Sequence, residues 1–303
     1  MRPTLMTRRL AGPGLALILA ACSGTAAPSA APEETPAATP APFVGDLDVG
    51  GRTLHIVCVG PEDSGRPTIV FEHGLGGDYR QWGDVLGGLK ATDRACSYDR
   101  AGLGMSEPAE TPRTTEDQAA DLEALLAAAG IEPPIVLVGF SVGGWNAMVY
   151  ADRHPDDVAG LVLVDVRPPE LSARILAELP AEVEGESEAL HGNRAEVTTF
   201  EADPSLNPEG LDLRASAAQA AAADFGDRPV RFLWVADTAP FWTGLEADLA
   251  ARLDAVLLAA RAELEAEVGD GGSVLVDAPH EIPGEQPGAV VDAVKEVLAA
   301  IGG

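Results

Sequence analysis

The sequence predicts an α/β protein with a mainly parallel sheet. Continuous apolar runs at 68–71, 135–138 and 161–164 are the first observation, because strands buried on both faces lack polar alternation. Stretches with helical periodicity lie between such runs, and strands that alternate with helices are typical of parallel sheets. The chain has 303 residues, of which 46% are hydrophobic, so it is long enough for one substantial domain.

Each expected element has a local signal. Gly50-Gly51 separates two strand-like runs, 43–49 and 52–59, and Gly-Gly between such runs predicts a hairpin. Gly130 is the stop signal of a helix over 115–129. The other expected strands span 67–72, 95–98, 135–138, 159–166, 231–235 and 273–276, and the other expected helices span 81–91, 144–154 and 287–301.

The alternation of strands and helices stops between Arg167 and Arg228. This stretch is rich in Ala, Glu and Leu and is interrupted by Pro and Gly residues. It predicts a helical insertion within the domain, which we expect to span 43–303, and not a separate domain.

The amino-terminal segment 1–21 has the features of a targeting signal. Its arginines precede an apolar run that is too short to span a bilayer comfortably. The run ends in Leu19-Ala20-Ala21-Cys22, which resembles the lipobox of bacterial lipoproteins, in which the cysteine is lipidated. We expect export with Cys22 anchored at the outer face of the bacterial cell membrane, or secretion if a plain signal is cleaved near Ala21. The Ala/Pro-rich residues 22–42 are an expected disordered tether.

The chain is strongly acidic, with 48 Asp and Glu residues against 20 Lys and Arg residues and a formal net charge of −28. Such a chain is a poor ligand for nucleic acid and is repelled by anionic lipid headgroups. We therefore expect a small-molecule substrate, membrane contact only through the lipid anchor, and a monomer. No Cys/His cluster has metal-ligand spacing and no phosphate-binding motif occurs, so no metal or cofactor is expected.

Gly139-Phe140-Ser141-Val142-Gly143 lies between the apolar run 135–138 and a helical stretch that begins at Gly144. When a Gly-x-Ser-x-Gly pattern lies between a strand and a helix, it typically presents a serine nucleophile on a tight turn. Glycines flank the turn because side chains there would collide with the neighbouring strand and helix. A serine hydroxyl is a weak nucleophile until a base removes its proton, so a histidine partner is required.

Five motifs in a fixed order make residues 43–301 resemble the α/β-hydrolase fold, in its esterase/lipase-like branch. The resemblance implies eight strands, with strands two to eight parallel, and a lid inserted after strand six, where 167–228 falls. The motifs are His73-Gly74-Leu75-Gly76-Gly77, the segment 98–106, Gly139-Phe140-Ser141-Val142-Gly143-Gly144, Leu161-Val162-Leu163-Val164-Asp165 and Ala278-Pro279-His280-Glu281-Ile282-Pro283.

The resemblance assigns Ser141 as the nucleophile and His280, which follows the last expected strand, as its base. The triad acid has two candidates. Asp237 follows strand seven, where the family usually carries the acid, but the usual Gly-x-x-Asp turn is absent. Asp165 ends strand six, where some members place the acid. We favour Asp165, because strand seven departs from the family pattern, and keep Asp237 as the alternative.

By the same resemblance, the oxyanion hole consists of the backbone N–H groups of Leu75 and Val142. His73 and Gly74 form the supporting loop, in which His73 props up the backbone and does not transfer protons. Residues 99–100 are expected to stabilise the oxyanion region as a structural ion pair or turn.

Several aromatic side chains are candidates for the substrate cavity, with core packing as the alternative reading: Trp145, Trp234, Phe241 and Trp242. In the family's strand order, strands two and four are neighbours, so a disulfide between Cys58 and Cys96 is sterically reasonable and suits an exported protein.

The expected activity is hydrolysis of carboxylic esters through an acyl-enzyme on Ser141. Amide, lactone or carbon–carbon bond hydrolysis would use the same residues. Serine, where aspartate would stand in epoxide hydrolases and dehalogenases, argues against those chemistries. A non-catalytic lipoprotein of the same fold that binds a ligand is the alternative function.

Overall fold

The computed structural model describes residues 42–268 and 272–302. The expected signal, the lipidation site Cys22 and nearly all of the expected tether lie outside the described residues. In the part that is described, no helix combines the length and the apolar character needed to cross a membrane.

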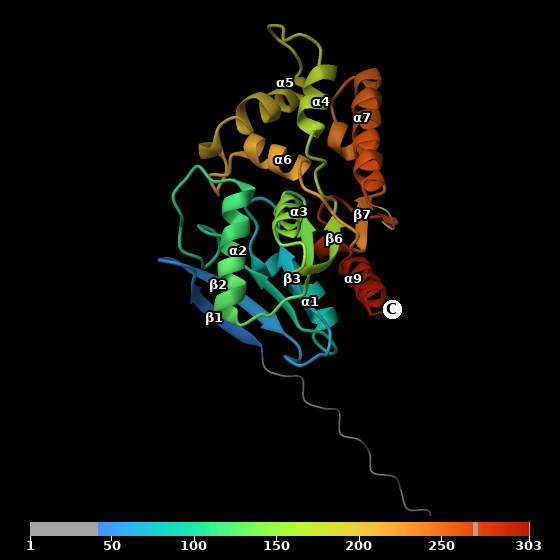
Figure 1. The fold of residues 1–303 in the computed structure, drawn as a ribbon. Coiled ribbons are helices and arrows are strands. Elements are labelled where there is room, and N and C mark those ends of the chain that lie inside the picture. Colours follow the sequence, from blue (N-terminus) through green and yellow to red (C-terminus); the bar gives the residue numbers. More distant parts are fainter. Residues whose placement is uncertain (1–41, 269–271, 303) are drawn as a thin grey trace, which may run out of the picture. The chain divides into compact units, whose positions relative to one another are not determined.

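A sheet of eight strands, in the order β1-β2-β4-β3-β5-β6-β7-β8, forms the centre of the described chain (Figure 1). β3 to β8 are parallel. The expectation that strands two to eight are all parallel was wrong for β2. This strand forms a tight hairpin with β1, and it pairs antiparallel with both β1 and β4. The strands are β1 (Phe43–Asp48), β2 (Thr53–Val59), β3 (Thr68–Glu72), β4 (Ala95–Tyr98), β5 (Ile135–Phe140), β6 (Val158–Val164), β7 (Val230–Val235) and β8 (Gly272–Val276).

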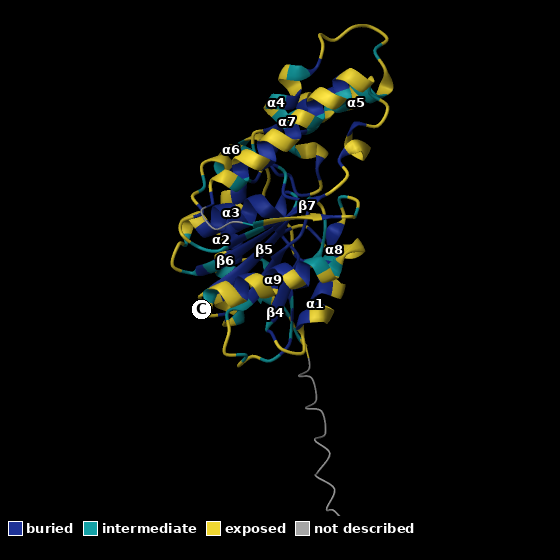
Figure 2. Ribbon diagram, turned by 90° about the vertical axis from the view of Figure 1, so that its right-hand side faces the viewer, coloured by how far each residue is buried: buried dark blue, intermediate teal, exposed yellow. Residues whose placement is uncertain are grey.

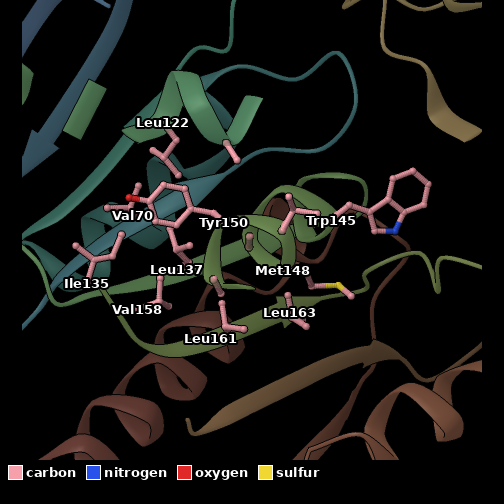
Figure 3. Close-up of a cluster of buried hydrophobic side chains, with 14 of the residues drawn as sticks. Val70, Leu122, Ile135, Leu137, Trp145, Met148, Tyr150, Val158, Leu161 and Leu163 are labelled. Atoms are coloured by element: carbon pink, nitrogen blue, oxygen red, sulfur yellow. The ribbon is translucent and has the colours of Figure 1, made fainter. Parts of the chain in front are cut away.

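Helices cover both faces of the sheet, and the alternation of side chains along β5 shows why both faces are apolar. Val136 and Val138 pack with α1 (Gly83–Leu89) and α9 (Pro287–Ile301). Ile135 and Leu137 point to the other face and pack with α2 (Thr115–Ala129) and α3 (Gly143–Arg153), as Figure 3 shows. A strand buried on both faces explains the continuous apolar run in the sequence.

The helix boundaries follow local signals closely. α2 and α9 have the expected bounds, and Gly130 ends α2 in the left-handed conformation with φ 64°. The helix expected over 81–91 is shorter: a 3₁₀ turn, η1 (Tyr79–Trp82), precedes α1. A further short helix, α8 (Ile282–Glu285), precedes α9.

The stretch between β6 and β7 is helical, as expected. Its first helix, α4, packs on α7, which lies between β7 and β8 (Figure 2). α7 was not anticipated from the sequence. We call α4, α5, η2, η4 and α7 the cap; it is drawn from two segments of the chain, whereas α6 packs on α2 and α3. The elements are α4 (Leu171–Glu178), α5 (Glu188–Ala195), the π-helical η2 (Glu196–Phe200), η3 (Pro204–Leu206), α6 (Leu213–Ala221), η4 (Ala239–Trp242) and α7 (Ala247–Ala266).

Cys58 of β2 and Cys96 of β4 form a disulfide, the pairing expected from the sequence. The two residues are direct partners in the antiparallel register, and their Cα atoms lie 4.0 Å apart. The bond therefore joins the β1–β2 hairpin to the parallel part of the sheet.

Candidate active site

Ser141 lies on the tight turn between β5 and α3, with a positive φ of 53° that non-glycine residues rarely adopt. The flanking glycines are required sterically. A Cβ atom at Gly143 would lie 2.3 Å from the His73 carbonyl oxygen, and one at Gly139 would lie 2.6 Å from the Cα of Gly144. The turn therefore holds the serine at the carboxyl edge of the sheet, as the strand–turn–helix motif predicts.

His280 and Asp165 meet at the same edge, because they follow the parallel strands β8 and β6. The His280 Nδ1 lies 2.6 Å from the Asp165 Oδ2. The Asp165 side chain is 3% exposed, whereas that of His280 is 43% exposed. A carboxylate on Nδ1 fixes the proton there, which leaves Nε2 with the lone pair that a general base needs.

Asp237 is remote from this pair. Its side chain is exposed and accepts a hydrogen bond of 3.0 Å from the backbone N–H of Ala239, at the start of η4. It does not line the cavity that Ser141, Asp165 and His280 share. Of the two candidate acids, Asp165 is the one in contact with the histidine.

Arg261 is a second partner of Asp165 that sequence reasoning missed. Its Nη2 donates to Asp165 Oδ1 at 2.8 Å, and the Val235 N–H approaches the same oxygen at 3.3 Å. Arg261 lies on α7, 96 residues from Asp165 along the chain, so no local motif links the two.

The loop after β3, for which the sequence predicts the oxyanion hole and which we call the oxyanion loop, is held by its carbonyl groups. The Gly74 carbonyl accepts from Arg100 Nη2 at 2.9 Å and from the Gly77 N–H at 3.1 Å. Because the peptide bond is planar and trans, fixing this carbonyl directs the N–H of Leu75 the opposite way. Within the described chain, neither this N–H nor that of Val142 donates to a protein group. Both amides remain available to a ligand oxygen.

His73 is fully buried beneath this loop. Burial, and secondarily the charge of Arg100, lower its pKa to about 3, so the imidazole is neutral at physiological pH. The Arg100 backbone N–H approaches Nε2 at 3.4 Å, and Nδ1 lies 2.9 Å from the Gly74 oxygen. A neutral ring whose Nδ1 donates to Gly74 supports the loop and is ill suited to proton transfer.

Arg100 and Glu209 form a buried ion pair behind the loop. The Arg100 Nε and Nη2 each donate to the Glu209 carboxylate at 2.7 Å. Glu209 also accepts from the Gly76 N–H at 2.8 Å. Burial alone would raise the pKa of Glu209, but the Arg100 guanidinium prevails and lowers it to about 2. Glu209 comes from the insertion between β6 and β7, and sequence reasoning missed it because 109 residues separate the partners.

A cavity of about 340 Å³ lies between the sheet edge and the cap, and Ser141, Asp165 and His280 line it. The other polar lining residues are Arg167, Asn193, Glu196 and Arg261. Trp145 and Trp234 do not line it and pack in the sheet core instead. The apolar wall consists of Val166, Pro168, Leu171, Ile175, Val197, Phe241, Trp242 and Leu257.

Potential metal ligands gather away from this cavity. Glu182, Glu186 and His191 are the one group of three that comes close enough to share an ion within the described ranges. Glu186 already pairs with Arg194, and none of the three lines the cavity.

Comparisons with known proteins agree with this architecture. A family model described as alpha/beta hydrolase fold matches residues 67–253. The uncharacterised protein YqjL of Bacillus subtilis is 36% identical over 98 residues, 32% of this chain and 39% of that protein. Human (lyso)-N-acylphosphatidylethanolamine lipase is 34% identical over 113 residues, 36% of this chain and 33% of that protein. The chain thus spans about a third of the length of these curated relatives.

Among solved structures, a thermophilic esterase from Thermogutta terrifontis is similar with a TM-score of 0.53. The similarity covers 86% of this chain and 99% of that chain at 21% identity, which is evidence of fold and not of substrate. The family model covers more than half of the chain and includes Ser141 and Asp165, so the chain belongs to the α/β hydrolase fold family.

Proposed function

We propose that this protein is a serine hydrolase that cleaves carboxylic esters through an acyl-enzyme. The observation that carries the proposal is the 2.6 Å contact between His280 and Asp165 at the wall of the cavity that also exposes Ser141. A nucleophile, an oriented base and two unengaged amides around one cavity are the parts that acyl transfer needs. The lipase among the similar proteins favours esters by analogy.

In the acylation step, His280 Nε2 accepts the proton of Ser141 as the serine oxygen attacks the ester carbonyl carbon. The carbonyl oxygen becomes an oxyanion and accepts hydrogen bonds from the N–H groups of Leu75 and Val142. Asp165 stabilises the imidazolium through Nδ1. When the tetrahedral intermediate collapses, the carbon–oxygen bond to the alcohol breaks and the imidazolium gives its proton to the leaving oxygen.

In the deacylation step, water takes the place of the alcohol. His280 accepts a proton from the water as the hydroxyl oxygen attacks the acyl carbon. The second tetrahedral intermediate breaks the bond to the serine oxygen, which recovers its proton from the imidazolium. The products are one carboxylic acid and one alcohol, and the enzyme returns to its starting state.

The cavity favours substrates with a compact, uncharged apolar group. Its volume of about 340 Å³ lies at the small end of the range for ligand sites. Cap residues such as Leu171, Ile175 and Leu257 supply most of its apolar wall. The nearby guanidinium of Arg167 is already engaged by Glu196 and Glu201 and is poorly placed to recruit an anionic substrate.

A fluorophosphonate probe tests the proposal directly, because it phosphonylates an activated serine. The purified protein should be labelled at Ser141, and the Ser141→Ala variant should not be labelled. A folded wild-type protein that resists labelling would refute the enzyme and favour the non-catalytic binding protein.

A panel of substrates separates the hydrolase chemistries that share these residues. p-Nitrophenyl butyrate should be cleaved with a higher kcat/KM than the palmitate ester, and faster than matched lactones and anilides. Preference for a lactone or an anilide would keep Ser141 as the nucleophile but overturn the ester assignment.

We also propose that the domain is exported and anchored by lipid on Cys22. The Leu19-Ala20-Ala21-Cys22 motif and the disulfide between Cys58 and Cys96, which suits an oxidising compartment, support this localisation. Metabolic labelling with radioactive palmitate in a bacterial host should mark the wild type and not the Cys22→Ala variant. Equal labelling of both, or of neither, would reject the anchor.

A further inference from the structure

The Asp165 carboxylate lies between two side chains of different kinds. One oxygen contacts the imidazole of His280, and the other contacts the guanidinium of Arg261, which is always charged. We propose that Arg261 is a positioning residue for the triad: from a helix of the cap, it holds the Asp165 carboxylate aligned with His280. This inference rests on the proposed hydrolase function.

Arg261 is itself held in place on several sides. Its side chain is 6% exposed, and its Nη1 donates to the Val235 carbonyl at 3.2 Å. Its guanidinium carbon lies 4.8 Å from the centre of the Trp234 ring, in a cation–π contact. A guanidinium fixed by a carbonyl and an aromatic ring has little freedom to leave the carboxylate.

The carboxylate has no comparable substitute for this partner. Besides Arg261, the described contacts of Asp165 Oδ1 comprise one backbone N–H, that of Val235, at 3.3 Å. An ionised carboxylate that is 3% exposed requires charge-assisted partners, because burial opposes ionisation. Without Arg261, the Asp165 carboxylate would be free to rotate, and rotation would release His280 from its productive orientation.

The charge of Arg261 also affects how strongly Asp165 favours the protonated form of His280. With Arg261 present, the negative charge of Asp165 is shared between two cations. When Arg261 is replaced by a neutral residue, the whole charge acts on His280 and favours the imidazolium form. The acid limb of the pH profile of kcat/KM should therefore move to higher pH.

Other charged groups surround this centre but do not bridge Asp165 in the same way. Arg167 and Glu196 line the same cavity and pair with each other, and Glu281 bonds to Gln81 beneath the loop of His280. On α7 itself, Asp254 bonds to Thr238 and Trp242, and Glu265 bonds to Trp234. In the described chain, Arg261 is the side-chain cation in contact with Asp165.

The test compares Arg261→Met and Arg261→Lys with a control on the same helix, Arg252→Met. The Arg252 side chain is 53% exposed, and it pairs with Glu178 on the surface. The concentration of active enzyme is titrated with the fluorophosphonate, so that loss of folded protein does not count as loss of rate. The pH profiles of kcat and kcat/KM on a short-chain ester are then measured for each protein.

We expect Arg261→Met to lower kcat by about 10–100-fold with KM within about threefold. The acid limb should move up by about 0.5–1 pH unit. Lysine keeps the charge but cannot bridge Asp165 and the Val235 carbonyl, so Arg261→Lys should keep the wild-type acid limb and recover part of kcat. Arg252→Met should match the wild type in kcat and in the position of the acid limb.

Arg261→Met with the rate and pH profile of the control would overturn the proposal, whatever its melting temperature. A second readout needs no activity: the low-field ¹H resonance of the imidazole N–H between His280 and Asp165, identified by its absence from His280→Gln. This resonance should shift or broaden in Arg261→Met and stay unchanged in Arg252→Met; an unchanged signal in both would also overturn the proposal. An inactive wild type would instead refute ester hydrolysis, while the resonance would still report on Arg261.

Discussion

Replacement of Glu209 by glutamine tests whether the insertion between β6 and β7 holds the oxyanion loop. The substitution keeps the shape of the side chain and removes its charge. Arg100, which is 2% exposed, would then keep Glu72 and the loop carbonyls as partners but lose its bidentate carboxylate. Leaving a buried guanidinium without such a partner strongly destabilises the folded protein.

The magnitude follows from the pKa of Glu209. Although burial opposes ionisation, Arg100 lowers this pKa from an ordinary 4.5 to about 2, which corresponds to about 3 kcal/mol in favour of the folded state. Because the folded-state pKa is the lower one, this contribution is fully present above about pH 4.5 and is lost as the pH falls toward about 2. Glu209→Gln should therefore lower the free energy of unfolding by about 3 kcal/mol at pH 7.

Urea unfolding followed by tryptophan fluorescence between pH 3 and pH 7 measures this effect. The difference between wild type and Glu209→Gln should be constant near neutral pH and should shrink below about pH 4.5. The control is Glu263→Gln, which removes an exposed carboxylate that pairs with Arg174 and should leave stability unchanged. A difference below about 1 kcal/mol at pH 7, or one independent of pH, would refute the account of Glu209.

Three further substitutions test the site and the sheet. Asp165→Asn should lower kcat at least about 10³-fold while Asp237→Asn stays within twofold of wild type; the reverse order would reassign the triad acid. Gly143→Ala places a Cβ atom 2.3 Å from a carbonyl oxygen, so we expect destabilisation by about 1–3 kcal/mol and loss of turnover, and a stable, active variant would contradict the turn geometry. Replacement of Cys58 and Cys96 by alanine should cost about 3–4 kcal/mol in urea unfolding, and equal stability of variant and oxidised wild type would show that the disulfide adds nothing.

Local signals predicted the elements best where the cause of the structure lies within a few residues. α2 ends at Gly130 because a left-handed residue terminates a helix, and that signal is readable in the sequence. The tight turn that carries Ser141 was predicted for the same reason, because the glycines that flank it are a local steric requirement. α7 was missed although it is 20 residues long, and with it the second segment of the cap.

Side-chain contacts between residues that are far apart in the sequence could not be predicted from the sequence alone. Two aspartates remained candidates for the triad, because each followed a strand that ends at the same edge of the sheet. The Asp237 side chain is exposed and accepts from the Ala239 N–H in the turn after β7, whereas Asp165 lies in contact with His280. Which carboxylate contacts His280 depends on the paths of the loops after the strands, and the hydrophobic periodicity of the sequence does not predict those paths.

The sequence alone determined the α/β alternation, the strand–turn–helix context of Ser141 and the acidic character of the chain, because these depend on residue spacing and composition. The tertiary structure alone decided the direction of β2, the neighbour of His280 and the roles open to Arg261 and Glu209. The contacts of Arg261, Glu209 and His280 join positions that are 96, 109 and 115 residues apart. Burial makes such contacts strong, and only the packed fold determines which groups are buried together.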